Sequence, residues 1–180
     1  GRITKEEARE LGMTGPNLRG SGVAYDIRRF EPYLKYDEVD FTIPIRDEGD
    51  CLARYFLRME EMRESIRIIE QCLDRLPEGP IRADDAKQAY PSKDEVYYSM
   101  EGMIHDFMYT QTGTQAPKGA HAYHAIESPK GELGFYLTSD GTGQPFRVRI
   151  NAPSFTNLQG MEYIMEGSLV ADTVVIIGSI

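Results

Sequence analysis

The sequence has no tryptophan, only two cysteines and few cations for its length. Twenty Lys and Arg residues stand against 29 Asp and Glu residues, a formal charge of −9. We expect no nucleic-acid partner, because binding a polyphosphate favours a basic surface. A membrane-spanning helix needs roughly 18 or more apolar residues. The nearest candidate, residues 169–177, is short and contains Asp172, so we expect no transmembrane helix in this sequence.

The two cysteines, Cys51 and Cys72, fall on one predicted helix. At about 1.5 Å per residue their Cα atoms lie about 30 Å apart, whereas a disulfide needs about 7 Å or less. We expect two free thiols in a reducing compartment, acting as buried small apolar side chains. The first residue is Gly1, and the segment after it lacks the apolar core of a signal peptide. We interpret the sequence as a piece of a longer protein.

The strongest periodic signal lies between Asp50 and Leu76, where apolar residues recur at intervals of three and four. Pro77 and Gly79 end it. A helix of this extent is about 40 Å long, a length typical of helical bundles. Thr4 and Glu7 form a capping-box pattern that opens a short helix. Further helices are predicted over residues 93–110, 155–165 and 169–180.

Strand-like alternation occurs on both sides of the Asp140–Gly141 turn signal, which predicts an antiparallel hairpin. Another strand is predicted over 120–126, and a short edge strand over 41–45. Arg147 and Arg149 share one face of the second hairpin strand. Two neighbouring cations need carboxylates or other anions, which either packed structural partners or a ligand or redox partner would supply.

These patterns predict an α+β fold, a long-helix bundle with an antiparallel β-hairpin or small sheet. By length, residues 1–180 form a single domain. We divide it into a loop-rich part (1–48), a helical bundle part (49–112), a β-hairpin part (113–153) and C-terminal helices (154–180).

The glycine-rich segment Gly15–Gly22 offers backbone amides to an anion, with Arg19 adding charge. A tight structural turn is the plainer interpretation. Asp26 has the position to clamp an arginine in a bidentate pair. A structural salt bridge that only fixes the loop is the plainer interpretation. His121, His124 and Glu127 have a spacing that suits a metal on a helix, but on a strand the two histidines point to opposite faces. We therefore predict no metal site.

Several blocks, occurring in order along nearly the whole chain, resemble one family. It is the hydrogenase-like large subunit, or D subunit, of respiratory complex I, the proton-translocating NADH–quinone oxidoreductase, in its C-terminal half. The blocks are Met13–Gly22, Tyr25–Arg28, Gly49–Tyr55, Glu60–Ile66, Glu127–Gln159 and Ala171–Ile180.

This resemblance implies a fold like that of nickel–iron hydrogenase large subunits. It places the quinone-headgroup His and Tyr in an N-terminal portion outside this sequence, so we expect no catalytic residue and no bound cofactor here. It implies NADH and quinone as substrates of the complex, with FMN and iron–sulfur clusters in partner subunits. Our candidates for the quinone pocket or for subunit contacts are Arg19, Ser21, Asp26, Arg28, Arg147 and Arg149.

The implied partners are the neighbouring iron–sulfur subunit, other peripheral-arm subunits and the membrane arm. The implied location is the cytoplasmic side of a bacterial membrane or the matrix side of the inner mitochondrial membrane. Two alternatives stay open at this point. One is the large subunit of an energy-converting nickel–iron hydrogenase, which would carry C-x-x-C pairs outside this sequence. The other is a scaffold domain without chemistry of its own.

Overall fold

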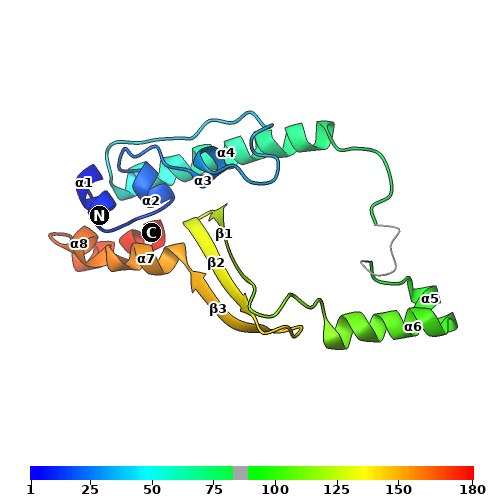
Figure 1. Ribbon diagram of the computed structural model, residues 1–180. Helices are drawn as coiled ribbons and strands as arrows, with labels where there is room; N and C mark the ends of the chain where they lie inside the picture. The colour runs from blue at the N-terminus through cyan, green and yellow to red at the C-terminus, as the bar shows by residue number, and fades with distance from the viewer. Residues whose placement is uncertain (83–88) are drawn as a thin grey trace. The chain divides into compact units, whose positions relative to one another are not determined.

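The computed structural model describes residues 1–82 and 89–180 (Figure 1). The chain divides into two compact units. The first unit comprises Gly1–Leu76, His124–Phe135 and Ile150–Ile180, and the second comprises Pro77–Tyr123 and Tyr136–Arg149. The four-part division expected from the sequence remains a prediction.

The first unit begins with helix α1, Lys5–Glu10, and the predicted capping box is confirmed. The Thr4 hydroxyl accepts a hydrogen bond from the Glu7 amide, and the Glu7 carboxylate accepts one from the Thr4 amide at 2.9 Å. Two one-turn helices follow in stretches expected to be mainly irregular, α2 (Pro16–Arg19) and α3 (Ile27–Phe30). Pro16 occupies the first turn of α2, where its missing N–H costs nothing.

The long helix is confirmed as α4, Cys51–Asp74. Asp50 caps it by accepting a hydrogen bond from the Ala53 amide at 2.7 Å. Both cysteines lie on this helix as free thiols, but Cys72 is exposed, which contradicts the buried role expected for it. Cys72 lies in the last turns of the helix, beyond the part of α4 that has buried residues.

Most of the apolar stripe on α4 is exposed in this chain. Only Ala53, Arg54 and Leu57 on α4 are buried. The exposed residues of the stripe are Leu52, Tyr55, Phe56, Met62, Ile66, Ile69 and Leu73. The bundle expected from the helix length is therefore not completed by the residues that the structure describes.

The edge strand predicted over 41–45 is wrong, because these residues form no strand. The segment is instead held to helices by polar contacts. The Thr42 amide donates to the Glu64 carboxylate at 2.8 Å, and Arg29 donates to the Phe41 carbonyl at 2.5 Å. Once side chains satisfy these main-chain groups, and because Pro44 has no N–H to give, pairing with another strand gains little.

The predicted hairpin is confirmed. It is part of a three-stranded sheet with the strand order β1-β2-β3. The strands are β1 (His121–Ser128), β2 (Gly131–Ser139) and β3 (Pro145–Asn151). Connections of two and five residues are too short for parallel crossovers, so the sheet is antiparallel. His121 and His124 lie on β1, as predicted.

The predicted C-terminal helices are shorter than expected. They are α7 (Pro153–Gln159), α8 (Met161–Met165), the 3-10 turn η2 (Val170–Asp172) and α9 (Thr173–Ser179). Side chains from α8 and α9 meet the N-terminal segment in one apolar core. Its buried members are Ile3, Ala8, Met13, Leu18, Ile164, Ile176 and Ile180.

In the second unit, the single helix predicted over 93–110 is broken at Ser99. It forms α5 (Lys93–Tyr98), α6 (Met100–Phe107) and a π-helical turn η1 (Met108–Thr112). Ser99 is extended and caps α6 through the Gly102 amide. A Cβ on Gly102 would overlap the Glu95 carbonyl group, so the absent side chain permits this tight crossing.

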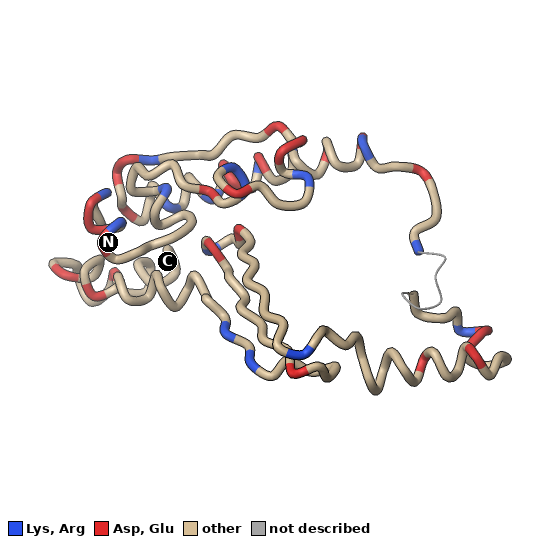
Figure 2. Tube along the Cα trace, viewed as in Figure 1, with Lys and Arg blue, Asp and Glu red and all other residues tan. Residues whose placement is uncertain are grey.

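Acidic and basic residues are interspersed along α1 and α4 rather than gathered in one run (Figure 2). Among the described residues, we find no helix with both the length and the apolar character needed to traverse a bilayer.

Candidate functional site

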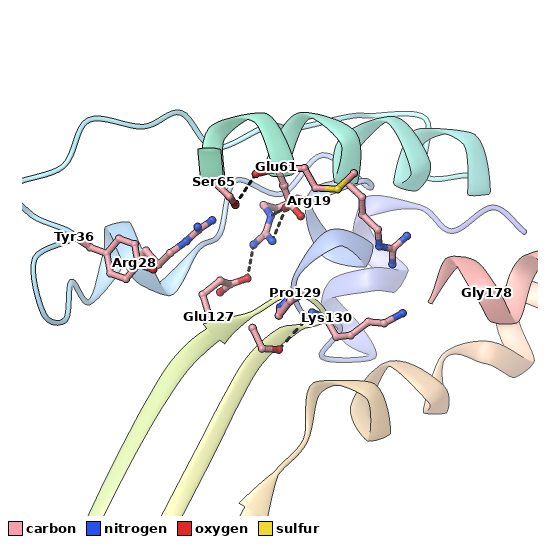
Figure 3. Close-up of a pocket in the computed structure, with 12 residues that line it drawn as sticks. Arg19, Arg28, Tyr36, Glu61, Ser65, Glu127, Pro129, Lys130 and Gly178 are labelled. Carbon is pink, nitrogen blue, oxygen red and sulfur yellow. Dashed lines mark hydrogen bonds and ion pairs between the residues drawn. The ribbon is translucent and has the colours of Figure 1, made fainter. Parts of the chain in front are cut away.

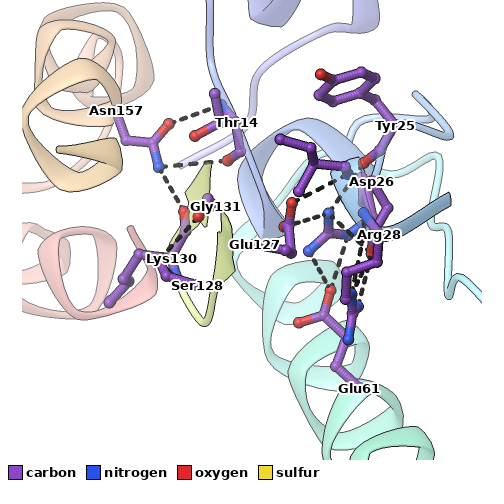
Figure 4. Close-up of polar contacts among 12 residues, drawn as sticks. Thr14, Tyr25, Asp26, Arg28, Glu61, Glu127, Ser128, Lys130, Gly131 and Asn157 are labelled. Carbon is purple, nitrogen blue, oxygen red and sulfur yellow. Dashed lines mark hydrogen bonds and ion pairs between the residues drawn. The ribbon is translucent and has the colours of Figure 1, made fainter. Parts of the chain in front are cut away.

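Arg19, at the end of α2, lies buried among the carboxylates of Asp26, Glu61 and Glu127. Figure 4 labels these three acidic residues. The Nη2 atom of Arg19 is 2.7 Å from Glu61 on α4, and its Nη1 atom is 2.8 Å from Glu127 on β1. Nη1 also donates to the Tyr25 carbonyl at 3.0 Å, and Asp26 lies 3.7 Å away. One guanidinium thus joins a loop, a helix and a strand that are far apart in sequence.

Asp26 is fully buried and holds Arg28 through two oxygens, which confirms the predicted bidentate pair. The distances are 3.0 Å from Nε to Oδ1 and 2.6 Å from Nη2 to Oδ2. The same carboxylate caps α3 by accepting from the Arg28 amide. Burial alone raises the pKa of Asp26. Hydrogen bonds and charge from Arg28, with the charge of Arg19, outweigh burial and bring that pKa below its ordinary value.

Glu127 differs from Asp26 although both contact Arg19. Burial raises the pKa of Glu127, and the nearby negative charge of Asp26 adds to that rise. The Arg19 guanidinium opposes the rise without cancelling it. The Glu127 amide donates to the Tyr33 hydroxyl at 3.1 Å, which fixes β1 against the loop after α3. The cluster therefore holds two carboxyl groups with pKa values shifted in opposite directions.

These charged groups border a cavity of about 520 Å³ within the first unit (Figure 3). Residues from α2, from α3 and the loop after it, from α4, from β1 and the β1–β2 turn, and from α9 line it. They are Arg19, Arg28, Tyr36, Arg58, Glu61, Met62, Ser65, Glu127, Ser128, Pro129, Lys130 and Gly178.

The β1–β2 turn is held at the cavity by Asn157 of α7, which is fully buried. Its Oδ1 accepts from the Thr14 amide at 3.0 Å, and its Nδ2 donates to the Lys130 carbonyl at 3.2 Å. Gly15 and Gly131 meet beside it, both with positive φ. A Cβ on Gly15 would lie 2.5 Å from the Gly131 Cα atom, so this backbone contact requires glycine.

A second buried arginine, Arg54 on α4, has no carboxylate partner among residues 1–82 and 89–180. It donates to the Ser179 hydroxyl at 2.9 Å and to the Gly49 and Gly1 carbonyls at 2.9 and 2.8 Å. Burial lowers its pKa below the ordinary value. Arg54 therefore ties α9 and the N-terminal segment to α4 through neutral acceptors.

The structure brings three of the six candidates together and separates the others. Arg19, Asp26 and Arg28 belong to the ion cluster. Ser21 is buried and donates to the Asn17 carbonyl at 3.0 Å, a contact inside the glycine-rich turn. Arg147 and Arg149 are exposed on β3, and no described residue forms an ion pair or hydrogen bond with either side chain. Their role as contacts remains a prediction.

Sequence reasoning missed Glu61, Arg58 and Lys130 as cavity residues. Glu61 and Arg58 are three apart on α4 and so share a face, a spacing visible in the sequence. Their meeting with Lys130 depends on how the hairpin packs. Asn157 carries no sequence signal, because a single amide in a helix is common. In the described part of the chain, no cluster of His, Cys, Asp and Glu residues could hold a metal ion.

Comparison with known proteins gives a consistent result. The chain is 82% identical over 180 residues to the D subunit of the NADH-quinone oxidoreductase of Salinibacter ruber, and spans 40% of that protein. It is 58% identical to the corresponding D 1 subunit of Chloroherpeton thalassium, of which it spans 41%. It is 52% identical over 181 residues to the D 2 subunit of a Rhizobium etli strain, of which it spans 45%. In each case all of this chain is covered.

The chain thus spans less than half the length of these curated relatives. A family match covers residues 1–180 without interruption. All the sequence blocks that carry the resemblance lie inside that match. The chain therefore belongs to the family described as respiratory-chain NADH dehydrogenase, 49 Kd subunit.

Proposed function

We propose that this chain is part of the quinone-reducing subunit of an NADH–quinone oxidoreductase. The observation that carries the proposal is the family match over all 180 residues, together with relatives named as D subunits of NADH-quinone oxidoreductases. In this proposal, electrons from NADH pass through FMN and iron–sulfur clusters of partner subunits to quinone. The reaction is coupled to proton translocation by the membrane arm.

The fold proposed for the whole subunit is that of nickel–iron hydrogenase large subunits. Asp50 caps the long helix α4, and Arg19 joins this helix to the hairpin. These contacts make α4 a rigid scaffold, which supports the proposed fold. The two cysteines of this chain lie 21 positions apart on one helix and do not form a C-x-x-C pair, so they do not suit a nickel–iron centre. The named relatives favour the quinone reductase over the hydrogenase alternative.

The role proposed for this part of the subunit is positioning rather than chemistry. Arg19 and Asp26 have their polar atoms engaged within the protein, which suits rigid framework around a cavity. Arg28 lines the cavity, and Arg147 and Arg149 are exposed, which suits contacts with quinone or with a neighbouring subunit. The proposed location is peripheral, on the cytoplasmic or matrix side of the membrane, beside the iron–sulfur subunit.

The test uses the assembled complex with and without the full-length subunit. With it, NADH should reduce both quinone and a water-soluble acceptor such as ferricyanide. Without it, ferricyanide reduction should persist while quinone reduction falls to background, because the soluble acceptor takes electrons before they reach this subunit. Quinone reduction that survives removal of the subunit would disprove the proposal, as would hydrogen evolution by the complete complex.

A paired substitution tests the positioning role. Arg28→Gln removes a cavity-lining charge, whereas Arg63→Gln removes an exposed charge of α4 that is off the cavity wall. We expect Arg28→Gln to raise the KM for quinone several-fold with a smaller effect on kcat, and Arg63→Gln to change neither. If the two substitutions have equal effects, Arg28 does not contact quinone.

A further inference from the structure

The charged residues that line the cavity fall into two groups, one that forms ion pairs within the protein and one that does not. In the first group, Glu61 and Glu127 are engaged by Arg19, and Arg28 is engaged by Asp26. In the second group are Arg58 of α4 and Lys130 of the β1–β2 turn. Among the described residues, neither of these two cations has a carboxylate within ion-pair distance.

The hydrogen-bonding capacity of these two cations is largely unused. Nη2 of Arg58 donates to the main-chain oxygens of Ser179 and Ile180 at 2.6 and 3.2 Å. Nε and Nη1 of Arg58 and the Lys130 ammonium have no acceptor in the described part of the chain. Both residues are half-buried, and burial lowers the pKa of each side chain. The charge of Arg58 lowers the pKa of Lys130 further.

The balance of charges around the cavity indicates what kind of group would bind to Arg58 and Lys130. The cavity wall carries four cations, Arg19, Arg28, Arg58 and Lys130, and two carboxylates, Glu61 and Glu127. A third carboxylate, Asp26, is not on the wall and pairs with Arg28. This excess is unusual in a chain whose net charge is −9. A single negative charge placed between Arg58 and Lys130 would balance the site and satisfy its free donors.

The available donors favour a carboxylate over a phosphate. Three hydroxyl-bearing residues line the cavity, Tyr36, Ser65 and Ser128. The two serine hydroxyls are already engaged, because Ser65 donates to the Glu61 carbonyl at 2.8 Å and Ser128 donates to the Gly131 carbonyl at 2.9 Å. An ammonium and part of one guanidinium match a group with two oxygens and one charge.

We propose that Arg58 and Lys130 form a binding site for a carboxylate group at this end of the cavity. The carboxylate comes either from an acidic side chain that is not among residues 1–180 or from a small carboxylic acid in solution. Either carboxylate would bind to the same two cations, and the two experiments below distinguish between the protein source and the solution source. The site is independent of the redox function proposed above.

The first experiment treats the assembled complex, carrying the full-length subunit, with a carbodiimide that joins contacting amines and carboxylates as amides. Mass spectrometry of the digested complex then identifies the partner of Lys130. For a protein source, we expect an amide between Lys130 and an Asp or Glu outside residues 1–180. Lys130→Arg keeps the charge but removes the reactive amine, so this amide should vanish. The ion pair Lys35–Glu38 serves as an internal positive control.

The second experiment measures binding of labelled succinate to the complex by equilibrium dialysis. For a solution source, we expect one succinate per subunit, with binding weakened at least tenfold by Lys130→Met and by Arg58→Gln. Lys118→Met and Arg63→Gln are matched controls, because both cations are exposed and lie off the cavity wall. Neither control should change binding.

The proposal fails if Lys130 couples only to carboxylates within residues 1–180, or to none, and succinate binding is absent or unaffected by the two cavity substitutions. Quinone reduction is measured on the same samples. If the unsubstituted complex reduces quinone but shows neither the amide nor succinate binding, this site alone is refuted. A confirmed site in a complex unable to reduce quinone would refute the proposed function alone.

Discussion

At the scale of single residues, Arg19 is the most connected side chain of the first unit. It is almost fully buried and contacts carboxylates from three separate segments. Burying a charge is costly unless partners compensate it, and removing one partner leaves the others uncompensated. The cluster is therefore stable as a whole and sensitive to the loss of any member.

Replacing Arg19 by Met should lower the free energy of unfolding of the full-length subunit by about 3–5 kcal/mol, because the buried Asp26 and the partly buried Glu61 and Glu127 lose a shared cation. Arg67→Met is the matched control. Arg67 pairs with Asp40 at the surface, where such pairs contribute about 0–1 kcal/mol. Denaturant unfolding of both variants measures the difference. Similar losses in the two variants would show that the buried cluster is not specially important.

The opposite pKa shifts of Asp26 and Glu127 predict opposite pH effects. Because the pKa of Asp26 lies below the ordinary value of 3.8, its contribution to stability is present above pH 3.8 and disappears as the pH falls toward the folded-state pKa. Because the pKa of Glu127 lies above 4.5, its ionisation costs stability as the pH rises above 4.5.

Melting temperatures measured between about pH 3 and pH 7 test both signs. Asp26→Asn should reduce the loss of stability on acidification below pH 3.8, relative to the unsubstituted protein. Glu127→Gln should instead reduce the loss that develops above pH 4.5. A pH profile that shifts in the same direction for both variants contradicts the assignment.

At the scale of secondary-structure elements, the least predictable feature is the break between α5 and α6. The periodic pattern of residues 93–110 continues across Ser99, yet Ser99 is extended and the two helices pack closely. The close approach at Gly102 decides this geometry, because a side chain there would overlap the Glu95 backbone. Helical periodicity alone does not distinguish one long helix from two that fold onto each other.

Gly102→Ala should destabilise the α5–α6 pair by about 1–3 kcal/mol, because the added methyl group overpacks a backbone contact. Amide hydrogen exchange across residues 93–112 should accelerate, while α4 stays protected. Gly178→Ala is the control, since a Cβ at Gly178 meets nothing within 4 Å. Unchanged exchange in the Gly102 variant would mean that the crossing has room to adjust.

At the scale of the whole molecule, the described chain leaves an extensive apolar surface on α4 uncovered. Exposed residues on this helix include Ile66, Ile69 and Leu73. The sheet adds more, because every residue of β3 is exposed. Exposed patches of this kind promote association. The chain also spans less than half of its curated relatives.

We expect the 180-residue chain, when isolated, to self-associate as its concentration rises. Sedimentation velocity at several concentrations should show a growing oligomeric fraction. The double substitution Ile66→Glu and Leu73→Glu should shift the protein toward monomer, because it places charge on the exposed apolar face of α4. Glu70→Gln, an exposed polar change on the same helix, should leave the distribution unchanged. A monomer at every concentration would contradict this prediction.

Local chemistry in the sequence was enough to predict the Thr4 capping box, the long α4 and the hairpin, because each depends on near neighbours in the chain. The same holds for the bidentate pair of Asp26 and Arg28, which are two residues apart. The family resemblance also came from the sequence alone, because its blocks are local patterns in a fixed order.

Only the tertiary structure decided which charges meet. Arg19 and Glu127 are 108 positions apart, and their contact depends on the packing of the hairpin against α2 and α4. The same packing brings Lys130 and Arg58 to the wall of one cavity and leaves both without a carboxylate within ion-pair distance among the described residues. Long-range electrostatic contacts depend on three-dimensional distance and burial, and neither quantity is encoded in sequence spacing.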